Sequence, residues 1–384
     1  MTYNNDMKTP YYMFDEGLLG RHIEQMVTIR EKYTSDDMSF CYAIKANPFL
    51  VPYIDKYVDH FEVCSWGELK ICKYYGVDPK KIVLSGVNKE PRNISEAIEY
   101  GVEILTVESM NQYDEIVRQV EEKGAHVRLL PRLSNGAQFG MEQCCLEEII
   151  RDRDKHPSID IAGIHYFTGT QKKKFSKIES ELKLLEEFIA GLKSKYGFEP
   201  ELLEYGPGLG VPYFIVDDFD SYYDLYEEMV RYIASAKYNY RVNLEMGRFF
   251  VASCGEYVTS VADVKGSEVA PILILDGGRN HISYYGQNMV MKTPVIEVER
   301  HDEIAVPCDL YGSLCSFNDM IAREVMIPKP QIGDRLIFKN IGAYSITEGI
   351  YLFLSRDLPA VYVKEIDGSC KMIRNSNPTY ENNC

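Results

Sequence analysis

The sequence has few basic residues relative to acidic ones. Its 384 residues include 42 Lys and Arg against 58 Asp and Glu, which gives a formal net charge of −16. Surfaces for nucleic acid or anionic lipid need an excess of positive charge, so we expect neither partner. No apolar run reaches the roughly 18–20 residues that cross a bilayer, so no membrane span is expected. The first residues, MTYNND, lack the basic and apolar regions of a secretion signal.

The ten cysteines lack the paired spacing of a disulfide framework, and no CxxC or Cys/His pattern indicates zinc. Apolar residues make up 45% and charged residues 26%, close to the averages of globular proteins. We therefore expect a cytoplasmic globular protein with free thiols and no structural metal.

Short apolar runs alternate with amphipathic stretches over the first two thirds of the chain. Strands that alternate with helices predict a parallel sheet with right-handed crossovers. Eight such units fit a (β/α)8 TIM barrel of the alanine racemase type, with an open doubly wound sheet as the alternative. The predicted strands are residues 40–44, 61–64, 82–85, 104–107, 127–130, 161–164, 202–205 and 242–244.

The pattern changes after about residue 270, where helical stretches become scarce. Runs rich in β-branched and aromatic residues cover 271–275, 335–339 and 360–364, with turn sequences between them. We predict a C-terminal antiparallel β domain. The barrel would comprise residues 31–270, and residues 1–30 and 271–384 would form a β-sandwich-like domain, to which the apolar segment 11–14 could contribute a strand.

A lysine directly follows the first predicted barrel strand, in the sequence YAIKAN. The carboxyl ends of barrel strands form the mouth where active sites lie. A desolvated Lys45 can attack a carbonyl and form a Schiff base. A strand-end lysine that faces solvent fits the same pattern.

Two further motifs follow strands seven and eight, where barrels often bind phosphate. In GPGLG, Gly206 and Gly208 allow backbone amides to approach an anion closely. In EMGR, Glu245 can accept a hydrogen bond from a protonated ring nitrogen, and Arg248 can bind phosphate. A local salt bridge between these two residues is the structural alternative.

Three more motifs carry candidate functional groups. In HYFTGTQ, after strand six, His165 can stack on a planar ring and Thr168 can donate to phosphate. In the β domain, LCSFND contains Cys315 as a candidate acid or base and Asp319 as a candidate substrate contact. GAYS contains Tyr344, either a phosphate ligand or a buried tyrosine whose hydroxyl is satisfied.

A phosphate-binding loop, a Schiff-base lysine, a ring-stacking histidine and a carboxylate for a pyridine nitrogen together describe a site for pyridoxal 5′-phosphate (PLP). Each motif alone also has a structural explanation. Their placement at one barrel mouth favours the cofactor site.

These motifs occur in the order YAIKAN, FEVCSWGEL, HYFTGTQ, GPGLG, EMGR, DGG, LCSFND and GAYS. In this order the chain resembles the fold-type III PLP-dependent decarboxylases, which include diaminopimelate, ornithine and biosynthetic arginine decarboxylases. The resemblance extends from about residue 9 to about residue 366. Alanine racemase shares the barrel and the lysine but lacks this set of motifs.

The resemblance implies that Lys45 carries the cofactor as a Schiff base, that His165 stacks on the ring and that Glu245 pairs with the ring nitrogen. It also implies that Cys315 protonates the carbanion after carbon dioxide leaves. Because Cys315 and its neighbours reach the partner subunit's site in this family, a homodimer with shared active sites is implied. The implied cofactor contacts are Lys45, Glu62, Arg132, His165, Thr168, Gly206, Gly208, Glu245, Gly247, Arg248 and Tyr344.

The candidate substrate contacts are Asp276, Arg279, Ser316 and Asp319. Relatives that act on diamino acids place an acid after the catalytic cysteine, where this chain has Ser316. Arg279 follows the DGG turn earlier than the arginine that binds the distal carboxylate in diaminopimelate decarboxylases. EMGR, HYFTGTQ and GPGLG also depart from the usual EPGR, HIGSQ and GGG. These departures favour a conjugated or carrier-bound amino acid as substrate, with diaminopimelate or another basic amino acid as the alternative.

Two other functions stay open at this point. A racemase or epimerase passes through the same carbanion, but racemases of this fold use a tyrosine base, whereas this chain has LCSFND. A non-catalytic PLP-binding homologue would tend to lose the lysine or the cysteine, and this chain keeps Lys45 and Cys315.

Overall fold

The computed structural model describes residues 7–34, 37–219, 222–283, 292–299 and 304–384. The chain divides into two compact units. The barrel unit comprises Ile23–Gly210 and Ser221–Phe249, and the β unit comprises Met1–His22, Val211–Asp220 and Phe250–Cys384.

The barrel unit contains a parallel sheet with the strand order β7-β6-β5-β4-β3-β2-β10-β9-β8. Every predicted barrel strand is present within a few residues of its expected position. The strands are β2 (Met38–Ala43), β3 (His60–Val63), β4 (Ile82–Leu84), β5 (Ile104–Val107), β6 (Val127–Pro131), β7 (Ile159–Ile161), β8 (Gly163–Phe167), β9 (Leu202–Gly206) and β10 (Arg241–Met246).

The sixth predicted strand forms two short strands, β7 and β8, which are interrupted at Ala162. The Ala162 N–H donates to the Leu129 carbonyl, and β7 pairs with β6 while β8 pairs with β9. A parallel bridge joins Arg132 to His165, and the Leu133 N–H donates to the His165 carbonyl at 3.0 Å. This bridge closes the sheet, which confirms the barrel and excludes the open-sheet alternative.

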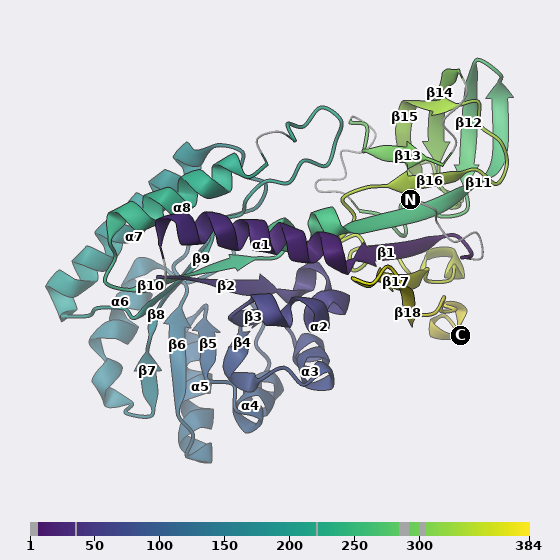
Figure 1. The fold of residues 1–384 in the computed structure, drawn as a ribbon. Coiled ribbons are helices and arrows are strands. Elements are labelled where there is room, and N and C mark those ends of the chain that lie inside the picture. The colour runs from purple at the N-terminus through teal and green to yellow at the C-terminus, as the bar shows by residue number, and fades with distance from the viewer. Residues whose placement is uncertain (1–6, 35–36, 220–221, 284–291, 300–303) are drawn as a thin grey trace. The chain divides into compact units, whose positions relative to one another are not determined.

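Helices surround the parallel strands of the barrel (Figure 1). Helices α3 and α5 begin at Ser65 and Ser109, whose hydroxyls accept from backbone amides three residues later. None of the helices described has the length and apolar character needed to span a membrane. The helices of the chain are α1 (Glu16–Tyr33), α2 (Val51–Ile54), α3 (Trp66–Tyr75), α4 (Pro91–Tyr100), α5 (Met110–Lys123), α6 (Gln143–Arg151), α7 (Phe175–Tyr196), α8 (Asp224–Ala236) and α9 (Arg248–Val251).

The β unit is built on a sheet with the path β15-β14-β12-β11-β1-β17-β18. In addition, β16 pairs with β11, and β13 pairs with β16. Most pairs are antiparallel, as predicted, but β1 pairs parallel to β17 and β12 pairs parallel to β14. Both parallel pairs join segments distant in sequence, so no hairpin turn dictates their direction. The strands are β1 (Tyr11–Asp15), β11 (Gly255–Ser267), β12 (Ala270–Leu275), β13 (Ile296–Val298), β14 (Ala305–Tyr311), β15 (Met320–Pro328), β16 (Arg335–Phe338), β17 (Ala360–Lys364) and β18 (Cys370–Arg374).

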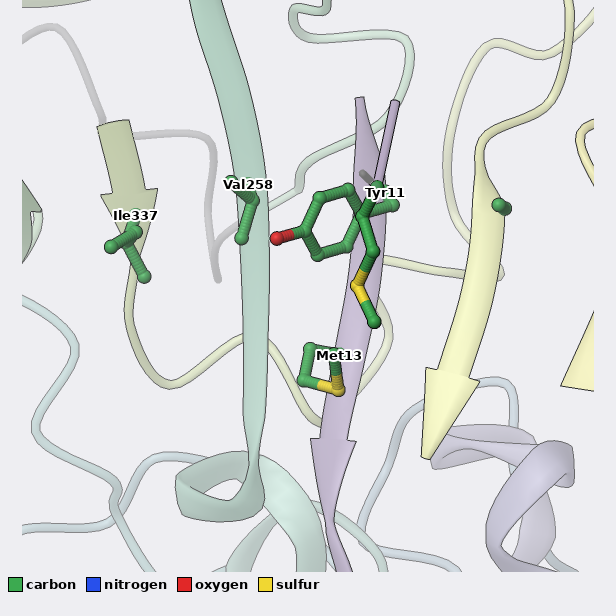
Figure 2. Packing of buried hydrophobic residues seen from close by; sticks show 6 residues of the cluster. Tyr11, Met13, Val258 and Ile337 are labelled. Carbon is green, nitrogen blue, oxygen red and sulfur yellow. The ribbon is translucent and has the colours of Figure 1, made fainter. Parts of the chain in front are cut away.

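Strand β1 lies between β11 and β17, so the N-terminal apolar segment pairs within the sheet of the β unit. Tyr11 and Met13 lie on one face of the strand and pack in a cluster with Val258 and Ile337 (Figure 2). The first four residues of this strand are buried, and they are apolar without alternation because both faces of the strand are covered.

Candidate active site at the barrel mouth

Lys45 lies in a short 3₁₀ turn, Ile44–Ala46, that directly follows β2. Its Nζ lies 2.6 Å from Oε2 of Glu62 and 3.9 Å from Oε1 of Glu245. Glu62 and Glu245 come from β3 and β10, the two neighbours of β2. The Lys45 side chain is 40% exposed, whereas that of Glu62 is 4% exposed. The amine of Lys45 therefore lies near two buried carboxylates and is accessible to a ligand.

Glu245 lies close to His165, which is fully buried on β8. Their closest atoms, Oε2 and Nε2, are 2.9 Å apart, but neither atom has a well-directed hydrogen bond among the described residues. Burial alone would raise the pKa of Glu245, but the nearby His165, Lys45 and Arg132 lower it below its usual value. Glu245 is therefore a carboxylate at neutral pH and can accept a hydrogen bond from a protonated ring nitrogen.

Arg132 follows β6 and is also buried. Its Nη1 lies 3.2 Å from Oε1 of Glu108, and its guanidinium lies over the rings of Phe139 and Phe167. Arg132 and Glu108 thus form a buried ion pair at the tips of adjacent strands, β5 and β6. Lys89 lies near this pair. Burial lowers the pKa of Lys89 to about 8, although the charge of Glu108 opposes this shift.

The predicted phosphate loop lies where the segments after β8, β9 and β10 come together. Gly208 has a φ of 61°, and a Cβ there would lie 1.9 Å from the Gly169 carbonyl oxygen, so only glycine fits. Gly206 ends β9, and Gly247 follows β10. Arg248 Nε donates to the Thr170 hydroxyl at 3.3 Å. This contact brings the Arg248 guanidinium to the segment after β8, which packs against the glycine loop at Gly208.

Thr168, a predicted phosphate ligand, instead donates from its hydroxyl to Glu181 Oε1 at 2.5 Å. Glu181 Oε2 also accepts from Lys172 Nζ at 2.6 Å and from the Tyr205 hydroxyl at 2.7 Å. Thr168 is therefore engaged within the protein through a glutamate on α7 that the sequence analysis did not identify.

A second polar layer lies inside the barrel sheet. Asn243 Nδ2 donates to Glu204 Oε2 at 2.6 Å, and the Ser39 hydroxyl donates to Asn243 Oδ1 at 2.8 Å. Burial, followed by the charge of Glu245, raises the pKa of Glu204 to about 8. Glu204 is therefore largely protonated at neutral pH.

In the β unit, Asp276 follows β12, and hydroxyl and amide groups surround its carboxylate. Oδ2 accepts from the Thr9 hydroxyl at 2.6 Å, and Oδ1 accepts from the Thr259 hydroxyl at 2.6 Å and from the Ser260 N–H at 2.9 Å. Both oxygens of this predicted substrate contact thus have partners within the unit.

Asp319 is buried, and it holds two loops of the β unit together. Oδ1 accepts from the Arg279 N–H at 2.9 Å, and Oδ2 accepts from the Leu314 N–H at 2.7 Å. Burial raises the pKa of this carboxyl, although the two backbone bonds oppose the shift. The structure thus brings the backbone of Arg279 and the carboxylate of Asp319 together.

The other candidates in the β unit lie in turns. Cys315 is exposed and Ser316 is partly buried, with its hydroxyl accepting from the Asn318 N–H at 3.2 Å. Tyr344 has a φ of 65°, and its carbonyl accepts from the amides of residues 347 and 348.

Several residues that the fold brings to the barrel candidates were not predicted from the sequence. Glu108 directly follows β5 and has the strand-end position that identified Lys45, so the same rule could have found it. Cys64, two residues beyond Glu62, lies within FEVCSWGEL but gave no signal separate from nine other cysteines. Glu181 and Thr170 became apparent only from their contacts.

The barrel site fits a bound PLP because several of its buried polar atoms lack hydrogen-bond partners. In and below this site, the buried atoms without a well-directed hydrogen bond to a described residue include Arg132 Nε, His165 Nδ1 and Nε2, Glu204 Oε1 and Glu245 Oε2, although His165 Nε2 and Glu245 Oε2 are 2.9 Å apart. Buried polar groups are rarely left without partners unless a ligand or water completes them. An accessible amine, a carboxylate for a ring nitrogen and a glycine loop with Arg248 form the set of groups that such a cofactor requires.

The family model of the pyridoxal-dependent decarboxylases, for their pyridoxal binding domain, matches residues 19–252. This range covers more than half of the chain and contains every barrel candidate described above. The chain therefore belongs to this family and is a PLP-dependent amino-acid decarboxylase. The predicted cofactor, fold and carboxy-lyase class are confirmed, in preference to the racemase and the non-catalytic homologue.

Two curated relatives are similar to this chain over most of its length, and a solved structure has the same fold. An L-glutamyl-(BtrI acyl-carrier protein) decarboxylase from Niallia circulans is 26% identical, over 96% of this chain and 91% of the relative. A 2-((L-alanin-3-ylcarbamoyl)methyl)-2-hydroxybutanedioate decarboxylase from Staphylococcus aureus is 28% identical, over 91% and 92%. The structure of diaminopimelate decarboxylase from M. jannaschii with L-lysine superposes with a TM-score of 0.87 at 23% identity, covering 96% of this chain and 90% of that one.

Proposed function

We propose that this decarboxylase removes the α-carboxylate of a conjugated or carrier-bound amino acid, with Lys45 as the amine that attaches the cofactor. The observation that carries the proposal is the convergence of Glu62 and Glu245 on the accessible Lys45 Nζ. With two carboxylates beside it, a lysine amine at a strand tip can take up and release a proton while a substrate amine takes its place on the cofactor.

The other barrel residues would hold the cofactor. Bound PLP supplies a carbonyl carbon for amines and an electron-withdrawing ring. Glu245, ionised at neutral pH, would accept a hydrogen bond from the ring nitrogen, and His165 would lie against the ring. Arg248 and the backbone amides near Gly208 would bind the phosphate, with Gly206 and Gly247 beside them. Tyr344 stays a proposed phosphate ligand on the family resemblance. Arg132 has a free Nε for a further cofactor oxygen.

Cys315 is the proposed proton donor, and we propose that it acts in a second subunit. The loop that carries it also carries Phe317, which is 103% exposed in the single chain. A fully exposed phenylalanine next to a functional cysteine is consistent with a loop that another protein surface covers. A homodimer with shared active sites would place Cys315, Ser316 and Asp319 at the partner's barrel mouth.

An anionic conjugate on the substrate is consistent with the charge beside the glycine loop. The Lys172 backbone pairs with Gly208 and Gly210, and the chain then presents the exposed side chains of Lys173, Lys174 and Lys177. This cluster is basic in a chain whose net charge is −16. The two relatives named above are decarboxylases of a carrier-bound and of a carboxylate-rich amino acid. Ser316 offers no charge for a distal ammonium.

Carbon dioxide release from a panel of substrates tests this function. The panel would contain glutamyl-carrier protein, a citrate-conjugated diamino acid, diaminopimelate, lysine, ornithine and arginine. We expect release from one conjugated substrate and at least 100-fold less from the free amino acids. Preference for diaminopimelate or lysine would establish the alternative substrate class.

Lys45→Ala is the matched variant for this experiment. We expect it to lose the visible absorption of the bound cofactor and to release carbon dioxide roughly a thousandfold more slowly. Retention of both properties would refute the role of Lys45. Lys89→Ala is not a suitable control because Lys89 is buried, so the exposed Lys183→Ala on α7 serves instead.

A further inference from the structure

A thiol lies beside the lysine at the barrel mouth. Cys64 Sγ is 2.9 Å from Oε1 of Glu62 and 3.5 Å from Nζ of Lys45. The other oxygen of Glu62, Oε2, is 2.6 Å from Lys45 Nζ. Cys64, Glu62 and Lys45 therefore form a closed triangle in which the carboxylate contacts the thiol through one oxygen and the amine through the other.

The backbone of Cys64 is held on two sides, so its side chain has a defined direction. Its N–H donates to Glu68 Oε2 at 2.6 Å, and Glu68 lies in the first turn of α3, whose start Ser65 caps. A Cβ at Gly86 would lie 2.5 Å from the Cys64 carbonyl oxygen, and Gly86 has a φ of 103°. The loop after β4 thus packs directly against the Cys64 backbone.

The thiol is in its protonated form at neutral pH. Burial raises the pKa of Cys64 well above its usual value, and the charge of Glu62 raises it further, while Lys45 opposes these effects. A protonated thiol can donate a hydrogen bond. Cys64 is thus a donor to Glu62 rather than a nucleophile in this position.

We propose that Cys64 is a positioning residue, whose S–H donates to Glu62 Oε1 and keeps Glu62 Oε2 directed at the amine of Lys45. Glu62 is almost fully buried, so without the thiol no water would readily replace this donor. Its carboxylate would then be free to rotate, and the amine of Lys45 would lose its fixed direction. The consequence for catalysis rests on the proposed role of Lys45, but the contact itself does not.

The contact is tested on the protein without cofactor, by the rate at which iodoacetamide alkylates Cys64 at pH 8. Peptide mass spectrometry separates Cys64 from the exposed Cys144, which is the internal reference. We expect alkylation of Cys64 to be slow in the wild type and at least about tenfold faster in Glu62→Gln, because the neutral amide no longer raises the pKa of the thiol. An equal rate in both proteins would overturn the contact, whatever the function of the enzyme.

The positioning role is tested by steady-state kinetics of the loaded enzyme. We expect Cys64→Ala to lower kcat about five- to tenfold with little change in KM, which corresponds to the loss of one hydrogen bond. Cys64→Ser, which keeps a donor, should restore most of kcat, and Cys144→Ala should resemble the wild type. If Cys64→Ala and Cys64→Ser both retain wild-type kcat, or if both lose it equally, Cys64 does not act as a hydrogen-bond donor to Glu62. The serine variant and the alkylation rates decide the question even if the alanine variant does not fold.

Discussion

Three charged or titratable groups of the barrel mouth and two aspartates of the β unit differ in how completely they are hydrogen bonded. At the barrel mouth, Arg132 and His165 are buried and each keeps a nitrogen without a partner among the described residues, and Glu245 Oε2 lies 2.9 Å from His165 Nε2 without a well-directed hydrogen bond. In the β unit, both oxygens of Asp276 and of Asp319 accept hydrogen bonds from hydroxyls or backbone amides.

This difference distinguishes groups with unused hydrogen-bonding capacity, which a ligand can take up, from groups whose hydrogen bonds stabilise the fold. A buried polar atom without a partner costs free energy, which a bound cofactor can recover by completing the hydrogen bonds. A carboxylate whose oxygens are already used has less capacity left for a substrate. Asp276 and Asp319, predicted from the sequence as substrate contacts, therefore have clear structural roles, whereas Glu245 does not.

The largest effect on activity is expected at the barrel mouth. Glu245→Gln keeps the shape of the side chain but removes its charge, so a bound ring nitrogen would lose its anionic acceptor. We expect kcat to fall about 100-fold or more, since charged groups at reacting centres contribute at this level. Circular dichroism and the thermal midpoint should change little. Loss of the fold together with activity would show that Glu245 is structural and would remove the contrast between the two regions.

The largest effect on stability is expected in the β unit. Asp319→Ala removes the acceptor for the backbone amides of Arg279 and Leu314, and we expect a loss of about 2–4 kcal/mol in the free energy of unfolding. Denaturant unfolding measures it. Asp319→Asn retains one acceptor oxygen and should lose about half as much. If Asp319→Asn is as stable as the wild type but has a strongly raised KM, Asp319 contacts the substrate. The contrast between the barrel mouth and the β unit would then not hold.

The dependence of stability on pH should reveal Glu204. Its pKa of about 8 lies above the value near 4.3 of an unfolded glutamate, so the folded state holds the proton more tightly. The contribution of this bound proton to the free energy of unfolding is fully present below the unfolded pKa. It is lost as the pH rises through about 4 to 8. We expect the wild type to lose on the order of a few kcal/mol more than Glu204→Gln between pH 5 and pH 9. Parallel thermal midpoints of the two proteins over this range would show that Glu204 does not titrate.

The smallest effect is expected at the exposed lysines beside the glycine loop. Changing Lys173, Lys174 and Lys177 together to glutamine should raise KM for an anionic conjugate about threefold at low salt, and the difference should shrink as salt increases. The exposed Lys183→Gln is the control. An unchanged KM would show that these exposed lysines do not contribute to substrate binding, which would then depend on the buried groups of the barrel mouth.

Much of the barrel site was predictable because a local pattern fixes where strand ends lie. Lys45, Glu62 and Glu245 each belong to an apolar strand or directly follow one, and the carboxyl ends of parallel strands meet at one mouth. The split of one predicted strand into β7 and β8 was not predictable, because Ala162 is apolar and interrupts the strand only through its pairing with neighbours.

The sequence by itself determined the positions and order of the barrel strands apart from the split at Ala162, the lysine at the first mouth position and the cofactor class, since these depend on local periodicity and on motifs. The tertiary structure alone decided that Cys64 contacts Glu62, that Thr168 donates to Glu181, and that Thr9 binds Asp276 across 267 residues. It also decided that β1 pairs parallel to β17. These contacts depend on how side chains from distant segments pack and satisfy one another, and no local sequence pattern encodes that.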